Sequence, residues 1–175
     1  MPEPPVPRFS AGGGVWADFG SGAGAFTLAL AELLGPGGTI YAIDRNAGAL
    51  RELARAIQAR FVGITLHQMR ADFTRPLDPP LPPLDGVVMA NSLHFVPPGQ
   101  QLPTVQRLRE LLRPGGRLLL VEYNLDRGNP WVPHPLSYPA WVRLAAEAGF
   151  QGTRQLAVRP SRFMREIYSA ESLAG

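Results

Sequence analysis

Runs rich in apolar and β-branched residues alternate along the chain with amphipathic segments, in which apolar residues recur every three or four positions. Short runs of the first kind are typical of strands in a buried sheet, and the second pattern is typical of helices. The runs predict strands at Val15–Ala17, Thr39–Ile43, Ile64–Met69, Leu84–Ala90 and Arg117–Glu122. The segments between and after them predict helices that begin at Ala25 and after Asn46, and helices at Leu102–Leu112 and Tyr138–Ala148.

This alternation of strand and helix predicts an α/β fold with a doubly wound, mostly parallel, seven-stranded sheet and right-handed crossovers. The last two strands, around Gln155–Arg159 and Phe163–Ser169, are separated by a turn at Pro160 and predict a C-terminal antiparallel hairpin. A chain of 175 residues can bury a core of its own. We therefore expect a single domain over residues 1–175, in which residues 1–13 form a flexible lead.

The connection between the third and fourth strands is unusual because it holds five prolines within Arg75–Pro83. Proline lacks an amide hydrogen and disrupts the interior of a helix, so no helix is expected here. An extended proline segment advances ~3.1 Å per residue, so about eight residues span roughly 25 Å. That length crosses three strand spacings of ~4.8 Å each and returns along one strand. We predict a crossover that contains no helix.

Composition narrows the classes of function. Apolar residues make up 45% of the chain and charged residues 18%, as in an ordered globular protein, and no apolar run is long enough to span a bilayer. No membrane partner is expected. The absence of cysteine excludes disulfides and thiolate metal sites and favours a cytoplasmic location. All 17 cationic residues are arginine and the formal net charge is +3, but no dense basic cluster stands out, so a nucleic-acid partner is not favoured.

A glycine-rich turn joins the first predicted strand to the first helix. After Asp18, which ends the strand, the glycines recur at every second position, as Gly20, Gly22 and Gly24. Glycine lets the backbone turn sharply and lets a ligand approach the amides at the helix start. The spacing fits a dinucleotide site, with Asp44 about 20 residues further on as the ribose-binding acid. An acid at the strand end repels a pyrophosphate, however, and suits a cofactor with an ammonium and a sulfonium group.

In this form, an acid before three alternating glycines, the turn resembles the first motif of the class I S-adenosylmethionine-dependent methyltransferases. The Leu112–Gly116 turn and the order of elements from Gly14 to Ser169 also resemble this family. The resemblance implies a Rossmann-like methyltransferase fold and S-adenosyl-L-methionine as cofactor. It implies that Asp44 accepts both ribose hydroxyls, that Asp72 accepts the adenine amine and that the Asn91 carbonyl binds the methionine ammonium. The implied cofactor-binding residues are Asp18, Gly20, Ser21, Gly22, Asp44, Arg45, Asp72, Phe73 and Asn91.

Methyl transfer is an in-line displacement at a sulfonium carbon, so the enzyme mainly aligns the reactants and excludes water. A base is needed only if the nucleophile arrives protonated. His94 is the first candidate, because it follows the fourth strand and imidazole exchanges protons near neutral pH, although it can equally be a histidine packed beside Phe95. Glu122 and Tyr123, at the end of the fifth strand, are the other catalytic candidates, as bases or substrate contacts. The histidines are isolated from one another along the chain, so no metal site is expected.

The acceptor is expected to be a small molecule, methylated at oxygen, nitrogen or carbon. The sequence Asn91-Ser92-Leu93-His94 differs from the Asn/Asp-Pro-Pro-Tyr/Phe motif of enzymes that methylate amino groups, which argues against an adenine or glutamine nitrogen. Only about 14 residues precede the first motif, too few for a substantial lid. The site is then either open or closed by the loop over Tyr123–Ser137, whose aromatic candidates are Trp131, His134 and Tyr138.

Three other interpretations stay open. The acceptor can be RNA or protein, because the site lacks an obvious cover and the chain is basic. The chain can instead be a NAD-dependent oxidoreductase that uses the same turn and Asp44, although it has no lysine to complete a Tyr-x-x-x-Lys pair. It can also be a partner subunit that binds the cofactor but performs no transfer.

Overall fold

The computed structural model describes residues 13–175, so the predicted flexible lead over residues 1–13 lies outside the described part except for Gly13. Strands and helices alternate as the apolar pattern predicts. The strands are β1 (Gly14–Phe19), β2 (Gly38–Asp44), β3 (Thr65–Arg70), β4 (Leu84–Ala90), β5 (Leu112–Tyr123), β6 (Phe150–Pro160) and β7 (Glu166–Ala174). The helices are α1 (Ala25–Leu34), α2 (Ala47–Arg60), α3 (Pro98–Leu111) and α4 (Tyr138–Glu147), with a 3₁₀ turn η1 (Leu93–Phe95).

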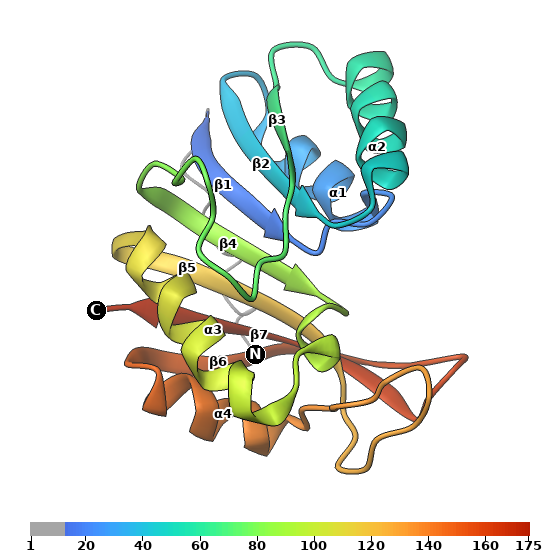
Figure 1. Cartoon of the computed structure of the whole chain (residues 1–175), viewed down its shortest axis with the longest axis vertical. Helices are drawn as coiled ribbons and strands as arrows, with labels where there is room; N and C mark the ends of the chain where they lie inside the picture. Colours follow the sequence, from blue (N-terminus) through green and yellow to red (C-terminus); the bar gives the residue numbers. More distant parts are fainter. Residues whose placement is uncertain (1–12) are drawn as a thin grey trace, which may run out of the picture.

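All seven strands form one sheet in the order β3-β2-β1-β4-β5-β7-β6 (Figure 1). Strands β1 to β5 pair in parallel, and β7 pairs antiparallel with both β5 and β6. The predicted fold class is therefore confirmed: α/β, doubly wound and mostly parallel, with a C-terminal antiparallel hairpin. The strand order reverses between β1 and β4, and ligands of open α/β sheets bind beyond the strand ends at such a point.

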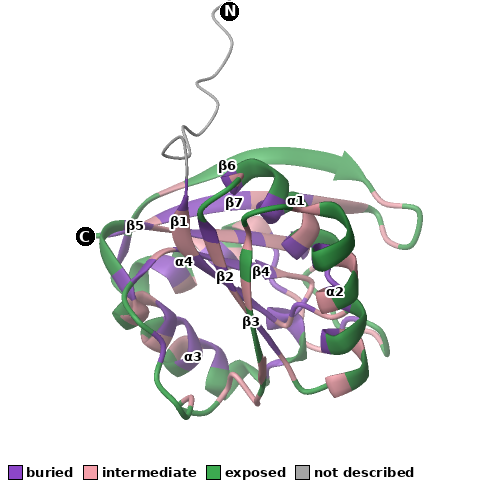
Figure 2. Ribbon diagram, turned by 90° about the horizontal axis from the view of Figure 1, so that it is seen from above, coloured by how far each residue is buried: buried purple, intermediate pink, exposed green. Residues whose placement is uncertain are grey.

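Helices cover both faces of the sheet, as the strand–helix alternation predicts. On one face α1 and α2 pack over β1, β2 and β3, and on the other α3 and α4 pack over β5, β6 and β7 (Figure 1). Each face has its own apolar cluster, centred on Trp16, Leu30, Ile40 and Leu53 on the first and on Phe19, Leu108, Leu118, Leu120 and Trp141 on the second. Strand β6 lies at the edge and is largely exposed (Figure 2). None of the described helices is long and apolar enough to cross a membrane.

The proline-rich connection from β3 to β4 contains no helix, as predicted. It passes β2 and β1 as an extended chain before β4 begins (Figure 1). Leu81 within it is buried, and Leu77 packs against the same cluster as Phe19. Two leucines of the crossover therefore supply part of the apolar cover that a helix would otherwise give this face.

The C-terminal hairpin has longer strands than predicted, and its turn lies elsewhere. Phe163, predicted to lie in the last strand, belongs to the connection between β6 and β7. Strand β7 is aligned by pairing with β5, where Arg117 opposes Leu173 and Tyr123 opposes Ile167. The prediction was wrong here because this register depends on a strand more than 40 residues away and not on the local pattern.

Two other boundaries also differ from the prediction. Helix α3 begins at Pro98, four residues before the predicted start, because proline is tolerated in the first helical turn. The predicted turn before the fifth strand is an irregularity inside β5. Leu84 pairs with Leu112 and Gly86 pairs with Arg117, so the four intervening β5 residues oppose a single β4 residue.

Candidate active site

The glycine turn after β1 places backbone beside an open cavity. Gly20 and Gly22 have φ angles of 82° and 52°, in the left-handed region that favours glycine. A Cβ atom on Gly20 would lie 2.5 Å from the Ser92 Cβ, whereas one on Gly22 would meet no atom within 4 Å. Gly20 therefore allows the ends of β1 and β4 to pack together, and Gly22 leaves room for a ligand against the backbone.

Of the predicted cofactor-binding residues, Asp18 lies beneath this turn and Ser21 lies within it, and neither lines the cavity. Asp18 is 1% exposed and accepts a hydrogen bond from Thr27 Oγ1 at 2.6 Å. Burial raises the pKa of Asp18 to about 6, against the opposing effect of the Thr27 hydrogen bond and with a smaller contribution from Asp44. Ser21 Oγ is buried and has no hydrogen-bond partner among the described residues.

Asp44, at the end of β2, links the glycine turn to the start of α2. Its Oδ2 accepts a hydrogen bond from the Gly22 amide at 2.8 Å, and its Oδ1 accepts one from the Asn46 amide at 2.8 Å. Asn46 in turn caps α2, since its Oδ1 accepts hydrogen bonds from two backbone amides of the first turn. Asn46 is thus the residue that caps α2. The Asp44 carboxylate borders the cavity, and each of its oxygens can accept a further hydrogen bond.

Asp72, just after β3, is held by several donors. Arg45 Nη2 lies 2.5 Å from its Oδ2, and Thr74 donates to its Oδ1 through the hydroxyl at 2.6 Å and the amide at 3.0 Å. The Arg45 hydrogen bond is the main reason that the pKa of Asp72 lies well below its ordinary range. Phe73 packs edge-on against Phe19, with ring centroids 6.2 Å apart.

Asn91, after β4, has a backbone conformation that is uncommon for a residue with a side chain. Its φ is 52°, and its amide donates a hydrogen bond to the Val121 carbonyl at 2.8 Å. Asn91 Oδ1 is buried without a hydrogen-bond partner among the described residues. The next residue, Ser92, donates from Oγ to the Phe19 carbonyl at 2.7 Å, which joins the ends of β1 and β4. A buried oxygen without a partner among the described residues can accept a hydrogen bond from a ligand or from water.

The strand ends converge on one cavity of about 580 Å³. Its lining comprises Gly20, Gly22, Asp44, Arg45, Phe73, Thr74, Asn91, Ser92, Phe95 and Val96. Asp72 lines an adjoining cavity of about 390 Å³ that shares Arg45, Thr74 and Phe95 with the first. Six predicted cofactor-binding residues therefore border one space, and a seventh borders its neighbour.

His94 and Glu122 form a buried pair beside this space. His94 Nδ1 and Glu122 Oε2 are 2.6 Å apart, and the two side chains are 2% and 0% exposed. Glu122 Oε1 accepts hydrogen bonds from the amides of Leu93 and His94 at 3.0 and 3.2 Å. A carboxylate at Nδ1 fixes the proton there and leaves Nε2 of the neutral ring as an acceptor. Glu122 thus lies behind His94 and lines neither this space nor the second cavity described below.

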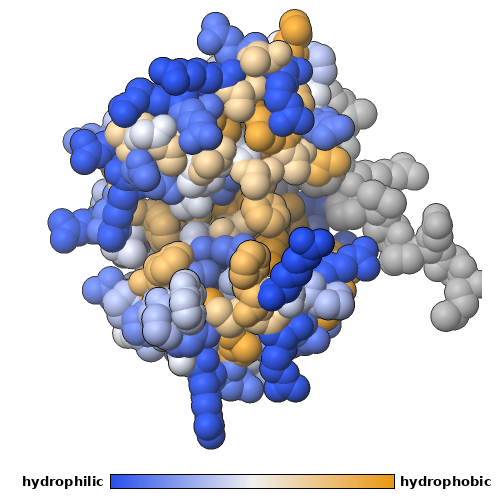
Figure 3. Space-filling view, turned by 90° about the vertical axis from the view of Figure 1, so that its right-hand side faces the viewer, coloured by the Kyte–Doolittle hydropathy of each residue, from blue (hydrophilic) through white to orange (hydrophobic). Residues whose placement is uncertain are grey.

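A second cavity, of about 550 Å³, lies on the other side of Asn91 and Phe95. It is lined by Asn91, His94, Phe95, Tyr123, Asn129, Trp131, Val132, Phe163 and Met164. At the carboxyl-end side of the sheet, apolar side chains gather around a hollow that hydrophilic ones surround (Figure 3). We call this second space the acceptor cavity, because it is the candidate site for a methyl acceptor.

Of the aromatic loop residues predicted to face the acceptor, Trp131 lines this cavity and two do not. The amide of His134 donates to the His94 carbonyl at 3.0 Å, so His134 supports the site through its backbone. Tyr138 packs edge-on against Tyr168, 5.6 Å away, near the core. Phe163 and Met164 also line the cavity, which they reach from the β6–β7 connection, and they were not predicted as site residues. No sequence signal marked them, because Phe163 was assigned to a strand.

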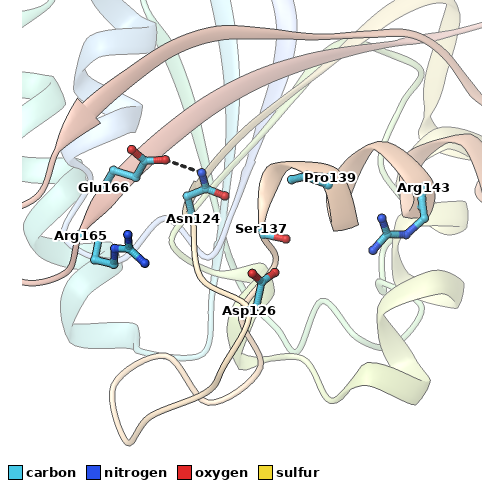
Figure 4. Close-up of a pocket in the computed structure, with 7 residues that line it drawn as sticks. All are labelled: Asn124, Asp126, Ser137, Pro139, Arg143, Arg165 and Glu166. Atoms are coloured by element: carbon cyan, nitrogen blue, oxygen red, sulfur yellow. Dashed lines mark hydrogen bonds between the residues drawn. The ribbon is translucent and has the colours of Figure 1, made fainter.

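A third, polar cavity of about 560 Å³ lies where the β5–α4 loop, α4 and the hairpin meet (Figure 4). Asn124 joins these elements: its side chain donates to Glu166 and accepts from the Tyr138 amide. Arg143 and Arg165 line the cavity together with Asp126 and Glu166. None of the predicted site residues lies there.

Comparison with known proteins agrees with this fold. The chain matches a family model described as a methyltransferase domain over residues 17–118. It is 32% identical over 120 residues to a carboxy-S-adenosyl-L-methionine synthase of Pseudomonas putida, an alignment that covers 66% of this chain and 47% of the relative. The chain thus spans about half the length of that curated relative.

Solved structures share the fold. An arsenic(III) S-adenosylmethionine methyltransferase from Chlamydomonas reinhardtii superposes with a TM-score of 0.73 at 19% identity, over 97% of this chain and 65% of the other. Magnesium protoporphyrin IX methyltransferase from Synechocystis PCC 6803, crystallised with S-adenosylmethionine, gives 0.71 at 19% identity, over 94% and 71%. From its family match, its strand order and its glycine turn, this chain belongs to the class I methyltransferase family, whose cofactor is S-adenosyl-L-methionine.

Proposed function

We propose that this chain transfers the methyl group of S-adenosyl-L-methionine to a small-molecule acceptor. The observation that carries the proposal is that two cavities adjoin at Asn91 and Phe95, one bordered by the strand ends and the other by the buried His94. In-line transfer needs the nucleophile, the methyl carbon and the sulfur on one line, so the space for the acceptor must adjoin the space for the cofactor. The names of the two structural neighbours, which refer to arsenic(III) and to magnesium protoporphyrin IX, support an acceptor of small size.

The residues around the first cavity suit a cationic nucleoside. When bound, S-adenosyl-L-methionine supplies a methyl group on a positively charged sulfur. Asp44 would accept the ribose hydroxyls with the lone pairs that the backbone amides leave free. Asn91 would bind the methionine ammonium through its carbonyl, and its unpaired Oδ1 offers a second acceptor. Asp18, beneath the turn, would add negative potential near that ammonium.

The adenine end of the cofactor would lie toward β3. Asp72 would accept the adenine amine and share its carboxylate with Arg45, whose side chain borders both adjoining cavities. The Phe73 amide would meet a ring nitrogen. Gly20, Ser21 and Gly22 would form the turn against which the cofactor lies. We propose no role for a metal ion. The proposed location is the cytoplasm.

His94 is the proposed catalytic base. Its Nε2 would accept a proton from an acceptor that arrives protonated, while Glu122 holds Nδ1 protonated and stabilises the imidazolium that forms. Glu122 is therefore a positioning residue rather than a substrate contact. Tyr123 lines the acceptor cavity near His94, with ring centroids 6.2 Å apart, and would contact the acceptor.

The first test is titration calorimetry with S-adenosylmethionine, S-adenosylhomocysteine and NAD. If S-adenosylmethionine and S-adenosylhomocysteine bind and NAD does not, the proposal is supported. If only NAD binds, the oxidoreductase interpretation replaces it. The second test measures S-adenosylhomocysteine release with a panel of small hydroxyl, amine and carbon acceptors. His94→Asn should lower the rate by about 10²–10⁴-fold and leave cofactor affinity unchanged.

Glu122→Gln tests the supporting role separately. It should lower the rate and shift the pH profile of the rate, because the amide no longer selects one His94 tautomer. A His94→Asn rate equal to that of the parent would remove His94 from the reaction. Cofactor binding without turnover of any acceptor, and with salt-sensitive RNA binding, would favour RNA as the acceptor. The same result without RNA binding would favour a non-catalytic subunit.

A further inference from the structure

We infer that the acceptor is an uncharged, flat aromatic molecule with a hydroxyl group, bound between the β5–α4 loop and the β6–β7 connection. This inference rests on the proposed function and names the substrate class of the same site. It depends on the lining of the acceptor cavity, the exposure of its aromatic side chains and the location of the nearest charges.

The lining of the acceptor cavity is mainly aromatic and apolar. Six of its nine lining residues have large aromatic or apolar side chains: Phe95, Tyr123, Trp131, Val132, Phe163 and Met164. Its other members are two asparagines and His94, so no arginine, aspartate or glutamate lines it. A charged acceptor would have to lose its hydration without gaining an opposite charge, which is unfavourable. The lining therefore selects an uncharged molecule.

Trp131 and Phe163 lie at this cavity with most of their surfaces in water. They are 73% and 83% exposed, and Phe95 beside them is 61% exposed. Large apolar side chains that remain exposed next to a cavity mark a binding surface. A flat aromatic ligand matches them because stacked or edge-on ring pairs add to the gain from burial.

The two cavity walls are held together. Asn129 Nδ2 donates to Met164 Sδ at 3.3 Å, and Asn129 Oδ1 accepts from the amides of Trp131 and Val132, each at 2.9 Å. Asn129 thus fixes the loop that carries Trp131 against the connection that carries Phe163. The wall on each side of the acceptor is preformed, which favours a rigid ligand over a flexible one.

The charges of this region lie in the polar cavity and not in the acceptor cavity. Arg143 and Arg165 line the polar cavity together with two acidic residues (Figure 4). Arg165 directly follows Met164, yet only Met164 lines the acceptor cavity. An anionic group on the acceptor would therefore have no arginine partner in its own cavity. This separation distinguishes a neutral phenol from a hydroxylated carboxylic acid.

A hydroxyl group completes the fit because His94 can take one proton. In the transfer step the hydroxyl oxygen forms a bond with the methyl carbon, and the carbon–sulfur bond breaks with its electron pair going to sulfur. The hydroxyl proton goes to His94 Nε2, which faces away from Glu122. The products are an aryl methyl ether, a neutral thioether and an imidazolium, so charge and atoms balance without another reactant.

Intrinsic fluorescence tests the inference without relying on turnover. The chain has three tryptophans, and Trp16 and Trp141 are buried, so Trp131 is the solvent-sensitive one. The protein loaded with S-adenosylhomocysteine is titrated with 4-propylphenol, its carboxylate analogue 3-(4-hydroxyphenyl)propionate, the cation tyramine and the saturated 4-propylcyclohexanol. We expect 4-propylphenol to shift the Trp131 emission and the two charged analogues to bind about tenfold more weakly. The saturated alcohol should also bind about tenfold more weakly.

Variants locate the site of binding. Phe163→Ala should weaken 4-propylphenol binding by about tenfold, whereas Arg143→Gln in the polar cavity is the matched control and should leave it unchanged. Trp131→Phe keeps a ring and should retain binding by calorimetry but lose the emission shift. Equal or tighter binding of the carboxylate, or no effect of Phe163→Ala, would overturn the inference. If S-adenosylhomocysteine binds and no phenol does, the inference fails alone; if the nucleoside does not bind, the proposed function fails.

Discussion

Replacing Asp18 with asparagine should raise the unfolding free energy relative to that of the wild type, by an amount that increases as the pH rises. Burial is the main reason that the pKa of Asp18 rises from an ordinary 3.8 to about 6. Between these values the folded chain binds more protons than the unfolded chain, so the stability of the wild type falls as pH rises through this window. With ~1.36 kcal/mol per pKa unit, keeping the buried carboxylate ionised costs about 3 kcal/mol at pH 7.

Asparagine has nearly the same shape, and its amide oxygen can accept the Thr27 hydrogen bond. If the side-chain NH₂ group of this asparagine finds no hydrogen-bond partner, the variant loses the same amount of stability at every pH. The pH dependence of the difference therefore isolates the ionisation cost. The difference in unfolding free energy between Asp18→Asn and the wild type should grow by about 2 kcal/mol from pH 4.5 to pH 7.5.

The assay is urea-induced unfolding without cofactor at several pH values in this range. Glu32→Gln, on the exposed surface of α1, is the control because it changes the net charge by the same amount. It should show no comparable trend. A difference for Asp18→Asn that stays constant, or shrinks as pH rises, would refute the reasoning that Asp18 is ionised at a cost inside the fold.

Other predictions concern the sheet and the cofactor site. Glu171→Gln removes a buried carboxylate that two arginines contact at 3.0 and 2.7 Å. It should lower the unfolding free energy in urea by about 1–3 kcal/mol, and an unchanged value would contradict this. Asp72→Asn should weaken S-adenosylmethionine binding by about tenfold or more in calorimetry, and unchanged affinity would remove Asp72 from the site. Gly86→Ala would place a Cβ atom 2.3 Å from the Trp16 ring. It should lower the melting temperature by roughly 4 °C or more, whereas Gly99→Ala, which meets no atom within 4 Å, should not.

The sequence indicated the fold and most of the residues around the first cavity because the relevant signals are local. Each parallel strand is a short run closed by a polar residue, and parallel strands direct their carboxyl ends to one edge. Asp44 and Asn91 could be placed at that edge from this rule alone. The glycine spacing after Asp18 is equally local. The five prolines also predicted that the crossover contains no helix, because proline disrupts a helix wherever it stands in the interior.

The proposed acceptor half was harder to predict because its contacts join distant segments. Glu122 and His94 are 28 residues apart, and only the pairing of β4 with β5 brings them together. A sequence pattern shows two candidate bases there, not one base and its support. Phe163 reaches the cavity because β7 pairs with β5 in a register that the local apolar pattern does not contain.

The helix-free crossover has a consequence for motion at the edge of the sheet. Strand β3 has one neighbour, and four of its six residues are exposed. Outer strands with little cover open at lower free energy than central ones, so the Thr65–Arg70 amides should exchange deuterium sooner than those of β1 or β4. Asp72 lies two residues after the end of β3, so a nucleoside that binds there would slow this exchange. Hydrogen–deuterium measurements would then record ligand binding as local ordering of β3.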